Sequence, residues 1–76
     1  MKLEEIKFDV HNEDVQRKAI DSNLGREVIL KDIDLEWFHG YLEEDPSDND
    51  YYKIRTEKGP FYRNYRGLQT LLLVNP

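Results

Sequence analysis

Hydrophobic and polar residues alternate with a period of two over most of the chain. Ile6, Phe8 and Val10 alternate with charged residues, which predicts a strand or an extended arm over residues 1–11. Beyond Gly25 the same period dominates, and turn-forming residues divide it into five segments. Each segment is typical of a strand: residues 26–33, 35–44, 51–57, 61–66 and 68–74.

A helical period appears over one short stretch, residues 13–24. Asn12 is a suitable N-cap, two acidic residues follow it, and Gly25 is well placed to end the helix. The apolar stripe of this helix is narrow, enough to lie on a sheet but not to form a bundle. Its members are Val15, Ala19 and Ile20.

Five short strands with tight connections favour a small antiparallel barrel over residues 26–74, because closure removes most exposed sheet edges. With the arm and the helix, we expect a mainly β (α+β) fold in a single domain, residues 1–76. The last strand carries hydrophobes on both faces, so the helix, the arm or a neighbouring subunit must cover the second face. Leu71 and Leu73 are therefore candidate contacts with a protein partner or a second copy.

Charge is distributed unevenly along the chain. Residues 1–50 carry six Lys or Arg and fifteen Asp or Glu, whereas residues 51–76 carry five and one. Residues 51–66 also hold five of the nine aromatic side chains. Rings stack on bases and cations bind phosphates, so this stretch is a candidate platform for RNA or single-stranded DNA, although strand alternation exposes only part of it. The candidate contacts are Tyr51, Lys53, Arg55, Arg63 and Arg66.

Other classes of function have little support in the sequence. The chain has no cysteine, which excludes disulfides and thiolate metal sites and fits a reducing compartment. It has no apolar run of roughly 18 residues and no secretory pattern at its start, so we expect a cytoplasmic protein without a membrane partner. The acidic residues 43–50 do not match a calcium loop. Because no nucleophile, base or phosphate loop is recognisable, we expect no catalysis, cofactor or metal.

Two short motifs stand in order on the predicted strands. The first contains an aromatic, a glycine, a hydrophobe, and then Asp and Asn four residues apart; the second is an Arg-Gly pair before the last strand. With these motifs, the chain from about Asn12 to Val74 resembles the Sm-like family of SH3-type small β-barrels. The resemblance implies a ring of subunits and a nucleotide pocket to which Asn49, Arg66 and Gly67 contribute. The motif residues are Phe38, Gly40, Leu42, Asp45 and Asn49, then Arg66 and Gly67.

Trp37 is the other candidate for a binding residue. Tyr41 shares its strand parity, whereas Phe38 and Leu42 share the opposite face, and one of these sets must be core. An exposed Trp37 is a natural anchor for a protein contact, and a buried one is a large contribution to the core. Two functions therefore stay open: a non-catalytic nucleic-acid-binding module, and a small acidic adaptor or inhibitor, of the kind found in phage or mobile elements, that binds a protein.

Overall fold

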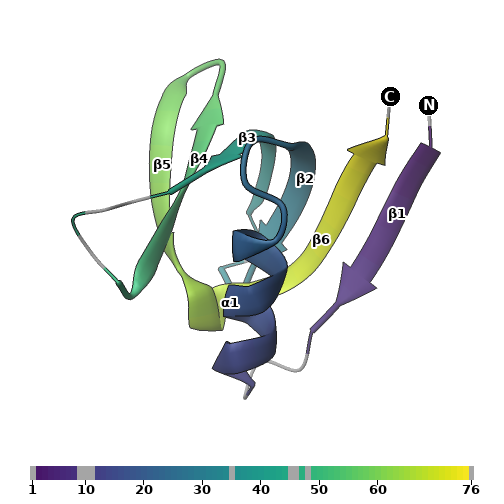
Figure 1. Cartoon of the computed structure of the whole chain (residues 1–76). Coiled ribbons are helices and arrows are strands. Elements are labelled where there is room, and N and C mark those ends of the chain that lie inside the picture. The colour runs from purple at the N-terminus through teal and green to yellow at the C-terminus, as the bar shows by residue number, and fades with distance from the viewer. Residues whose placement is uncertain (1, 9–11, 35, 45–46, 48, 76) are drawn as a thin grey trace.

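The computed structural model describes residues 2–8, 12–34, 36–44, 47 and 49–75. Six strands and one helix make up the regular structure of this part of the chain, with a short 3₁₀ turn before the last strand (Figure 1). The elements are β1 (Lys2–Lys7), α1 (Glu13–Asp21), β2 (Glu27–Asp32), β3 (Trp37–Glu43), β4 (Tyr51–Thr56), β5 (Gly59–Asn64), η1 (Tyr65–Gly67) and β6 (Leu68–Asn75).

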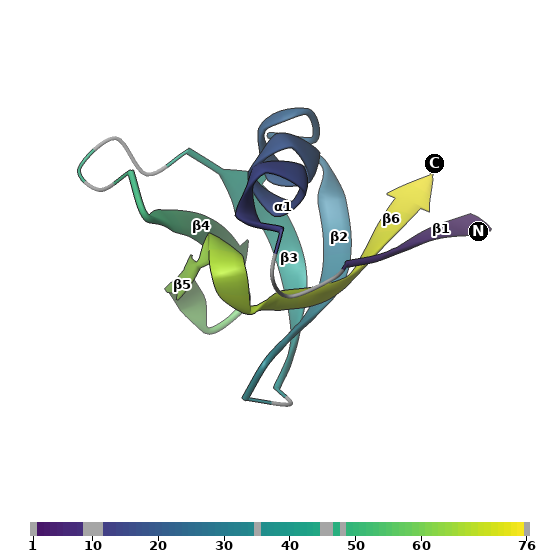
Figure 2. The same cartoon turned by 90° about the horizontal axis from the view of Figure 1, so that it is seen from below.

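The strands form one antiparallel sheet in the order β1-β6-β2-β3-β4-β5. This confirms the expected mainly β fold with a single helix. The sheet is open, with β1 and β5 at its edges, and a closed five-stranded barrel is not seen. The polypeptide still curls, and in both views α1 lies between the β4–β5 hairpin and the β6–β1 pair (Figures 1 and 2).

The N-terminal arm is a sixth strand. All six residues of β1 pair with β6, from Lys2 opposite Asn75 to Lys7 opposite Thr70, so the two ends of the described chain lie side by side (Figure 2). Without β1, the outer edge of β6 would expose a row of unpaired N–H and C=O groups. The arm therefore protects that edge within the same chain.

Strand alternation decides which side chains form the core. On β3 every second residue is buried, and on β4 Tyr52 and Ile54 are, as expected for a sheet with one covered face. The helix supplies the cover through Ile20, which is fully buried against the sheet residues. Ile6 and Phe8 of the arm pack against the same cluster at its margin. The cluster of buried hydrophobes consists of Ile20, Val28, Leu30, Phe38, Leu42, Tyr52, Ile54, Tyr65, Leu68, Leu71 and Leu73.

The helix differs from the sequence-based expectation in its apolar stripe. Val15 is half exposed, and Gln16 is the fully buried residue one position later. The Gln16 side-chain amide donates hydrogen bonds to the main-chain carbonyl oxygens of Arg66 (3.1 Å) and Leu68 (2.8 Å). These two hydrogen bonds satisfy the amide nitrogen of Gln16 and join α1 to the start of β6, whereas its Oε1 atom has no hydrogen-bond partner among the described residues.

The helix is also shorter than expected at its C-terminus. It begins at Glu13, with the Asn12 side chain accepting a hydrogen bond from the Val15 amide (3.4 Å), as the sequence predicted. It ends at Asp21 rather than at residue 24. The Asn23 side chain donates to the Ala19 carbonyl oxygen (2.7 Å), which satisfies a carbonyl of the last turn and lets the chain turn there.

Candidate functional site

Trp37 lies on the outer face of the sheet. Its side chain is 55% exposed, whereas Phe38 and Leu42, on the opposite parity of β3, are buried. The Lys31 ammonium lies 5.7 Å from the centroid of the Trp37 ring, on the neighbouring strand β2. Of the two sets that the sequence left open, the Phe38 set is therefore core and the Trp37 set faces solvent.

A cleft of about 500 Å³ opens beside Trp37, between the first half of β3 and the turn that joins β4 to β5. Phe38 and Phe61 contribute an aromatic pair to its lining, with ring centroids 5.2 Å apart. Its volume lies within the range of roughly 300–1,000 Å³ that is common for ligand sites. The lining residues are Glu36, Trp37, Phe38, His39, Thr56, Glu57, Lys58 and Phe61.

The backbones of β3 and β4 are in close contact at Gly40, directly beside the cleft. A Cβ atom at this position would lie 2.0 Å from the Arg55 carbonyl oxygen, so only glycine allows the two backbones to approach this closely. Pairing between β3 and β4 covers Tyr41 to Glu43. The earlier half of β3 diverges from the hairpin and forms one wall of the cleft.

The charged groups in the lining of the cleft have both signs. Glu36 forms an ion pair with Arg63 (3.1 Å), and the His39 ring lies 2.7 Å from a carboxylate oxygen of Glu27. Glu57 is exposed and makes no ion pair with any described residue. The cation in the lining is Lys58, which is also exposed.

The basic residues proposed for nucleic-acid contact lie next to carboxylates of the same chain. Lys53 and Arg55 share Glu43, at 3.6 Å and 2.7 Å. Arg63 and Arg66 have carboxylate partners as well, Asp32 and Glu13. Because each cation has an acidic neighbour, the positive potential available to a phosphate is smaller than the local sequence composition indicates.

Arg63 has a structural contact that the sequence did not reveal. Its Nε atom lies 2.9 Å from a carboxylate oxygen of Asp32, which is buried at the end of β2. The other carboxylate oxygen of Asp32 accepts main-chain hydrogen bonds from Asp34 (3.0 Å) and Glu36 (3.4 Å). Arg63 therefore links β5 to the β2–β3 turn across the open sheet, and its guanidinium also covers the Phe38 ring at 4.8 Å.

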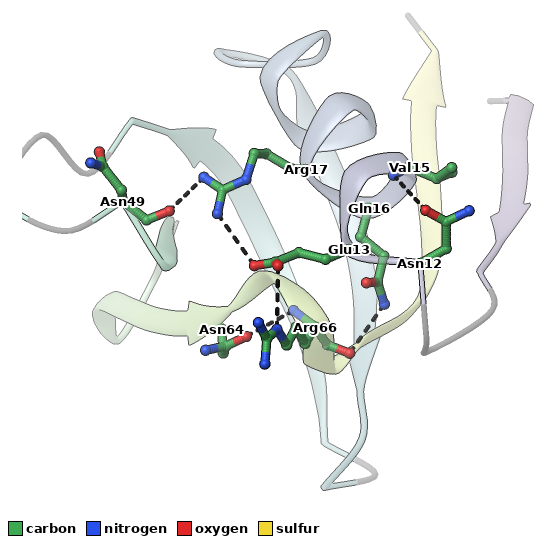
Figure 3. A network of polar contacts seen from close by, with 8 residues as sticks. All are labelled: Asn12, Glu13, Val15, Gln16, Arg17, Asn49, Asn64 and Arg66. Carbon is green, nitrogen blue, oxygen red and sulfur yellow. Dashed lines mark hydrogen bonds and ion pairs between the residues drawn. The ribbon is translucent and has the colours of Figure 1, made fainter.

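Asn49 and Arg66, two of the residues expected to form a nucleotide pocket, are linked through Arg17 and Glu13 at the start of α1 (Figure 3). The Glu13 carboxylate forms ion pairs with Arg17 and Arg66, each at 3.3 Å. Arg17 also donates to the main-chain carbonyl oxygen of Asn49 and lies 4.3 Å from the centroid of the Tyr65 ring. Glu13 thus occupies the position between the two guanidinium groups that an anionic ligand would need.

The remaining predicted residues lie in different settings. Gly67 follows Arg66 in η1, and its carbonyl oxygen accepts a hydrogen bond from the Ile33 amide (2.7 Å). Tyr51 is exposed on the outer face, at a distance along the sheet from the cleft. Asp45 of the first motif lies outside the described residues. Leu71 and Leu73, proposed as protein contacts, are buried in the core because their side chains face α1 rather than solvent.

Two tyrosines have pKa values above the ordinary range of tyrosine. Burial is the main cause for Tyr52, and the nearby Asp32 carboxylate adds to it. Burial also raises the pKa of Tyr65, with a further contribution from Asp21. Both phenols are therefore neutral at physiological pH, and neither has the lowered pKa of an activated nucleophile.

Trp37 can be identified as a candidate from the sequence, whereas most of the cleft around it cannot. Glu36, Thr56, Glu57 and Lys58 lie at strand ends and in a turn, where hydrophobic periodicity carries no signal. The Lys58-Gly59-Pro60 turn was the one available indication, because it placed a hairpin tip near the aromatic stretch. Nothing in the sequence indicated that this tip faces β3.

Comparison with protein-family models, with curated proteins and with solved structures found no match. Among the described residues, no helix has both the length and the apolar character needed to cross a membrane. The same residues contain no group of three His, Cys, Asp or Glu side chains placed to hold a metal ion. The function must therefore be inferred from the geometry of the chain itself.

Proposed function

We propose that this chain is a non-catalytic module that binds a protein partner through Trp37 and the adjoining cleft. The observation that carries the proposal is the position of Trp37, 55% exposed at the rim of a cleft with an aromatic lining. Tryptophan is enriched among the residues that dominate binding energy, and clefts beside such anchors exclude water from the contact. The intramolecular ion pairs of Arg55, Arg63 and Arg66 favour a protein partner over a nucleic acid.

The test begins with capture of proteins from the source cells and identification of a specifically retained protein by mass spectrometry. The purified pair is then measured by calorimetry with the natural chain, Trp37→Ala and Tyr62→Ala. Tyr62 is a matched control, because it is similarly exposed at 48% but does not line the cleft. We expect Trp37→Ala to weaken binding about 30-fold and Tyr62→Ala to change it less than about threefold.

Binding of RNA and single-stranded DNA is the alternative, and it is tested in the same samples. Fluorescence anisotropy of labelled oligonucleotides at low and physiological salt measures the phosphate contribution, because each neutralised phosphate steepens the salt dependence. Tight, salt-dependent binding that Arg55→Glu removes and Trp37→Ala preserves would overturn the protein-binding proposal. It would return the exposed rings of Tyr51 and Tyr62 to the role of stacking platforms.

We also propose that the chain is related to the Sm-like family of SH3-type barrels. This relation is supported by the pairing of β6 with β2 and by the 3₁₀ turn η1 directly before β6. Assembly of subunits through the outer edge of β6 would first require β1 to leave, because β1 pairs along that edge. Mass measurement by light scattering tests this point, and a ring formed by the full chain would show that the arm is displaced.

A further inference from the structure

The strand that covers the outer edge of β6 matches its neighbour poorly. The central residues of β6, residues 71–74, are hydrophobic on both faces of the sheet. In β1, Glu4 stands opposite Leu73 and Glu5 stands opposite Leu72, and both glutamates are exposed. A carboxylate opposite a leucine gains neither the apolar contact nor the opposite charge that stabilises a cross-strand pair. These two pairs therefore add little side-chain contact to the β1–β6 ladder.

β1 has few other attachments to the molecule. Ile6 is half-buried and the other residues of the strand are exposed, and Phe8 just beyond it also packs at the margin of the core. Within the described part of the chain, the ion pair of β1 joins Lys7 to Glu5 of the same strand at 3.6 Å, so it does not anchor the strand to β6. The β1–β6 pair lies at the margin of the molecule in both views (Figures 1 and 2). Because release of β1 exposes little buried apolar surface, β1 has the properties of a segment that opens locally.

The direction of the hydrogen bonds along β6 shows which of its main-chain groups a different strand would meet. The Gln69 carbonyl oxygen accepts a hydrogen bond from the Phe8 amide at 3.1 Å, so the main-chain groups of Gln69 face the β1 side. Because these directions alternate along a strand, the groups of Leu71 and Leu73 face the same side, whereas those of Leu72 face β2. Without β1, the outer edge of β6 would therefore present donors and acceptors on both sides of Leu72.

This edge is complementary to itself. When two copies of β6 run antiparallel with Leu72 on the twofold axis, Leu71 of each copy stands opposite Leu73 of the other in a hydrogen-bonded position. The Leu71 and Leu73 side chains then share the core face, and the two Leu72 side chains meet on the outer face. Hydrophobe meets hydrophobe at these three central positions, whereas β1 places Glu4 and Glu5 at two of them. The arrangement closes at two copies, because both contribute the same edge.

We infer that the outer edge of β6 is an interface between two copies of this chain, and that β1 occupies this interface in the monomer. In the dimer, the two sheets join through β6 into one continuous antiparallel sheet. In the monomer, β1 competes with the second copy because it belongs to the same chain and is present at a high effective concentration. Dimer formation therefore depends on the concentration of the chain and on the strength of the β1–β6 pairing. Trp37 takes no part in this interface, because β2 separates β3 from β6.

Proline substitutions in β1 of the full chain test the competition, because they weaken β1 and leave β6 unchanged. Glu4→Pro removes an amide that faces β6, whereas Glu5→Pro, the matched control, removes an amide that faces solvent. Both side chains are exposed, so neither substitution alters the core. In sedimentation velocity experiments over a range of concentrations, Glu4→Pro should lower the dimer dissociation constant at least about tenfold, and Glu5→Pro should change it less than about threefold. The associated species should have the mass of two copies.

Disulfide cross-linking determines the register and does not depend on the proline variants. The natural chain has no cysteine, so Leu72→Cys and Thr70→Cys each introduce one thiol on the outer face, at positions that are both half-buried in the monomer. On the twofold axis, two copies of position 72 lie within reach of a disulfide, whereas two copies of position 70 lie about 13 Å apart along the strands. Under mild oxidation, Leu72→Cys should therefore form a covalent dimer at least about tenfold faster than Thr70→Cys.

Three results would overturn the inference. The first is a Glu4→Pro chain that remains a monomer at every concentration. The second is an associated species larger than two copies, which would indicate a head-to-tail contact rather than a twofold one. The third is cross-linking of Thr70→Cys as fast as that of Leu72→Cys, which would indicate random collision. The proposed protein-binding function is decided separately, by the effect of Trp37→Ala on binding to the captured protein.

Discussion

Replacement of Gly40 by alanine should remove a large part of the free energy of unfolding of this chain. The new Cβ atom would lie 2.0 Å from the Arg55 carbonyl oxygen and 2.7 Å from its carbonyl carbon. An ordinary contact begins near 3.4 Å, so the two backbones would have to separate by more than about 1 Å. That separation strains the adjacent Tyr41–Arg55 pair of the short β3–β4 ladder.

The expected loss combines two effects. Overpacking with a backbone shift costs about 1–3 kcal/mol, and each weakened hydrogen bond adds about 0.5–1.5 kcal/mol. We therefore expect Gly40→Ala to lower the free energy of unfolding by about 3 kcal/mol. A domain of this length has a total of only about 4–11 kcal/mol, so the change is large.

Urea unfolding followed by tryptophan fluorescence measures the loss. Gly67→Ala is the matched control, because its Cβ atom would lie at an ordinary 3.4 Å from the Ile33 side chain and Gly67 has no positive φ. The control should stay within about 1 kcal/mol of the natural chain. The close approach of β4 to β3 would be refuted if Gly40→Ala were as stable as Gly67→Ala with an unchanged urea dependence.

Three other perturbations test the fold. Arg63→Met leaves the buried Asp32 carboxylate without its cation, so it should lower the free energy of unfolding in urea by about 3 kcal/mol. A loss below about 1 kcal/mol would contradict a structural role for that ion pair. At pH 8, Tyr52→Phe should be as stable as the natural chain or more stable by up to about 1 kcal/mol, since the Tyr52 hydroxyl finds no hydrogen-bond partner among the described residues. Because the pKa of Tyr52 is raised in the folded chain, its neutral form stabilises the fold below about pH 10, and this contribution is lost at higher pH. The natural chain should therefore lose more stability than Tyr52→Phe between about pH 8 and pH 11. Removal of residues 1–8 should expose the edge of β6 and produce concentration-dependent association in sedimentation velocity experiments, and a monomer at all concentrations would show that β1 does not protect this edge.

Local features of the fold could be predicted from the sequence because they depend on short-range chemistry. Asn12 begins the helix as its capping propensity indicates, and the strand period places Tyr52 and Ile54 on the same face of β4. Only the structure shows that this face is the buried one. Each of these inferences needs only neighbouring residues along one element.

The roles of the basic residues could not be predicted in the same way. Arg63 and Arg66 were considered as phosphate contacts from their place in a basic stretch, but their acidic partners are Asp32 and Glu13, distant in sequence. The burial of Gln16 likewise has no signal in the sequence, because the carbonyl groups that accept its hydrogen bonds belong to Arg66 and to the start of β6. A polar side chain becomes part of a core only where the fold supplies its partner.

By itself, therefore, the sequence determined a mainly β domain, one capped helix, the parity of each strand and a basic aromatic stretch. Tertiary structure alone decided that Trp37 faces solvent, that β1 closes the edge of β6 and that a cleft opens where β4 leaves β3. The physical reason is the range of the interactions. Propensity and periodicity act over a few residues, whereas a cleft and its charge are set by pairings between segments far apart in the chain.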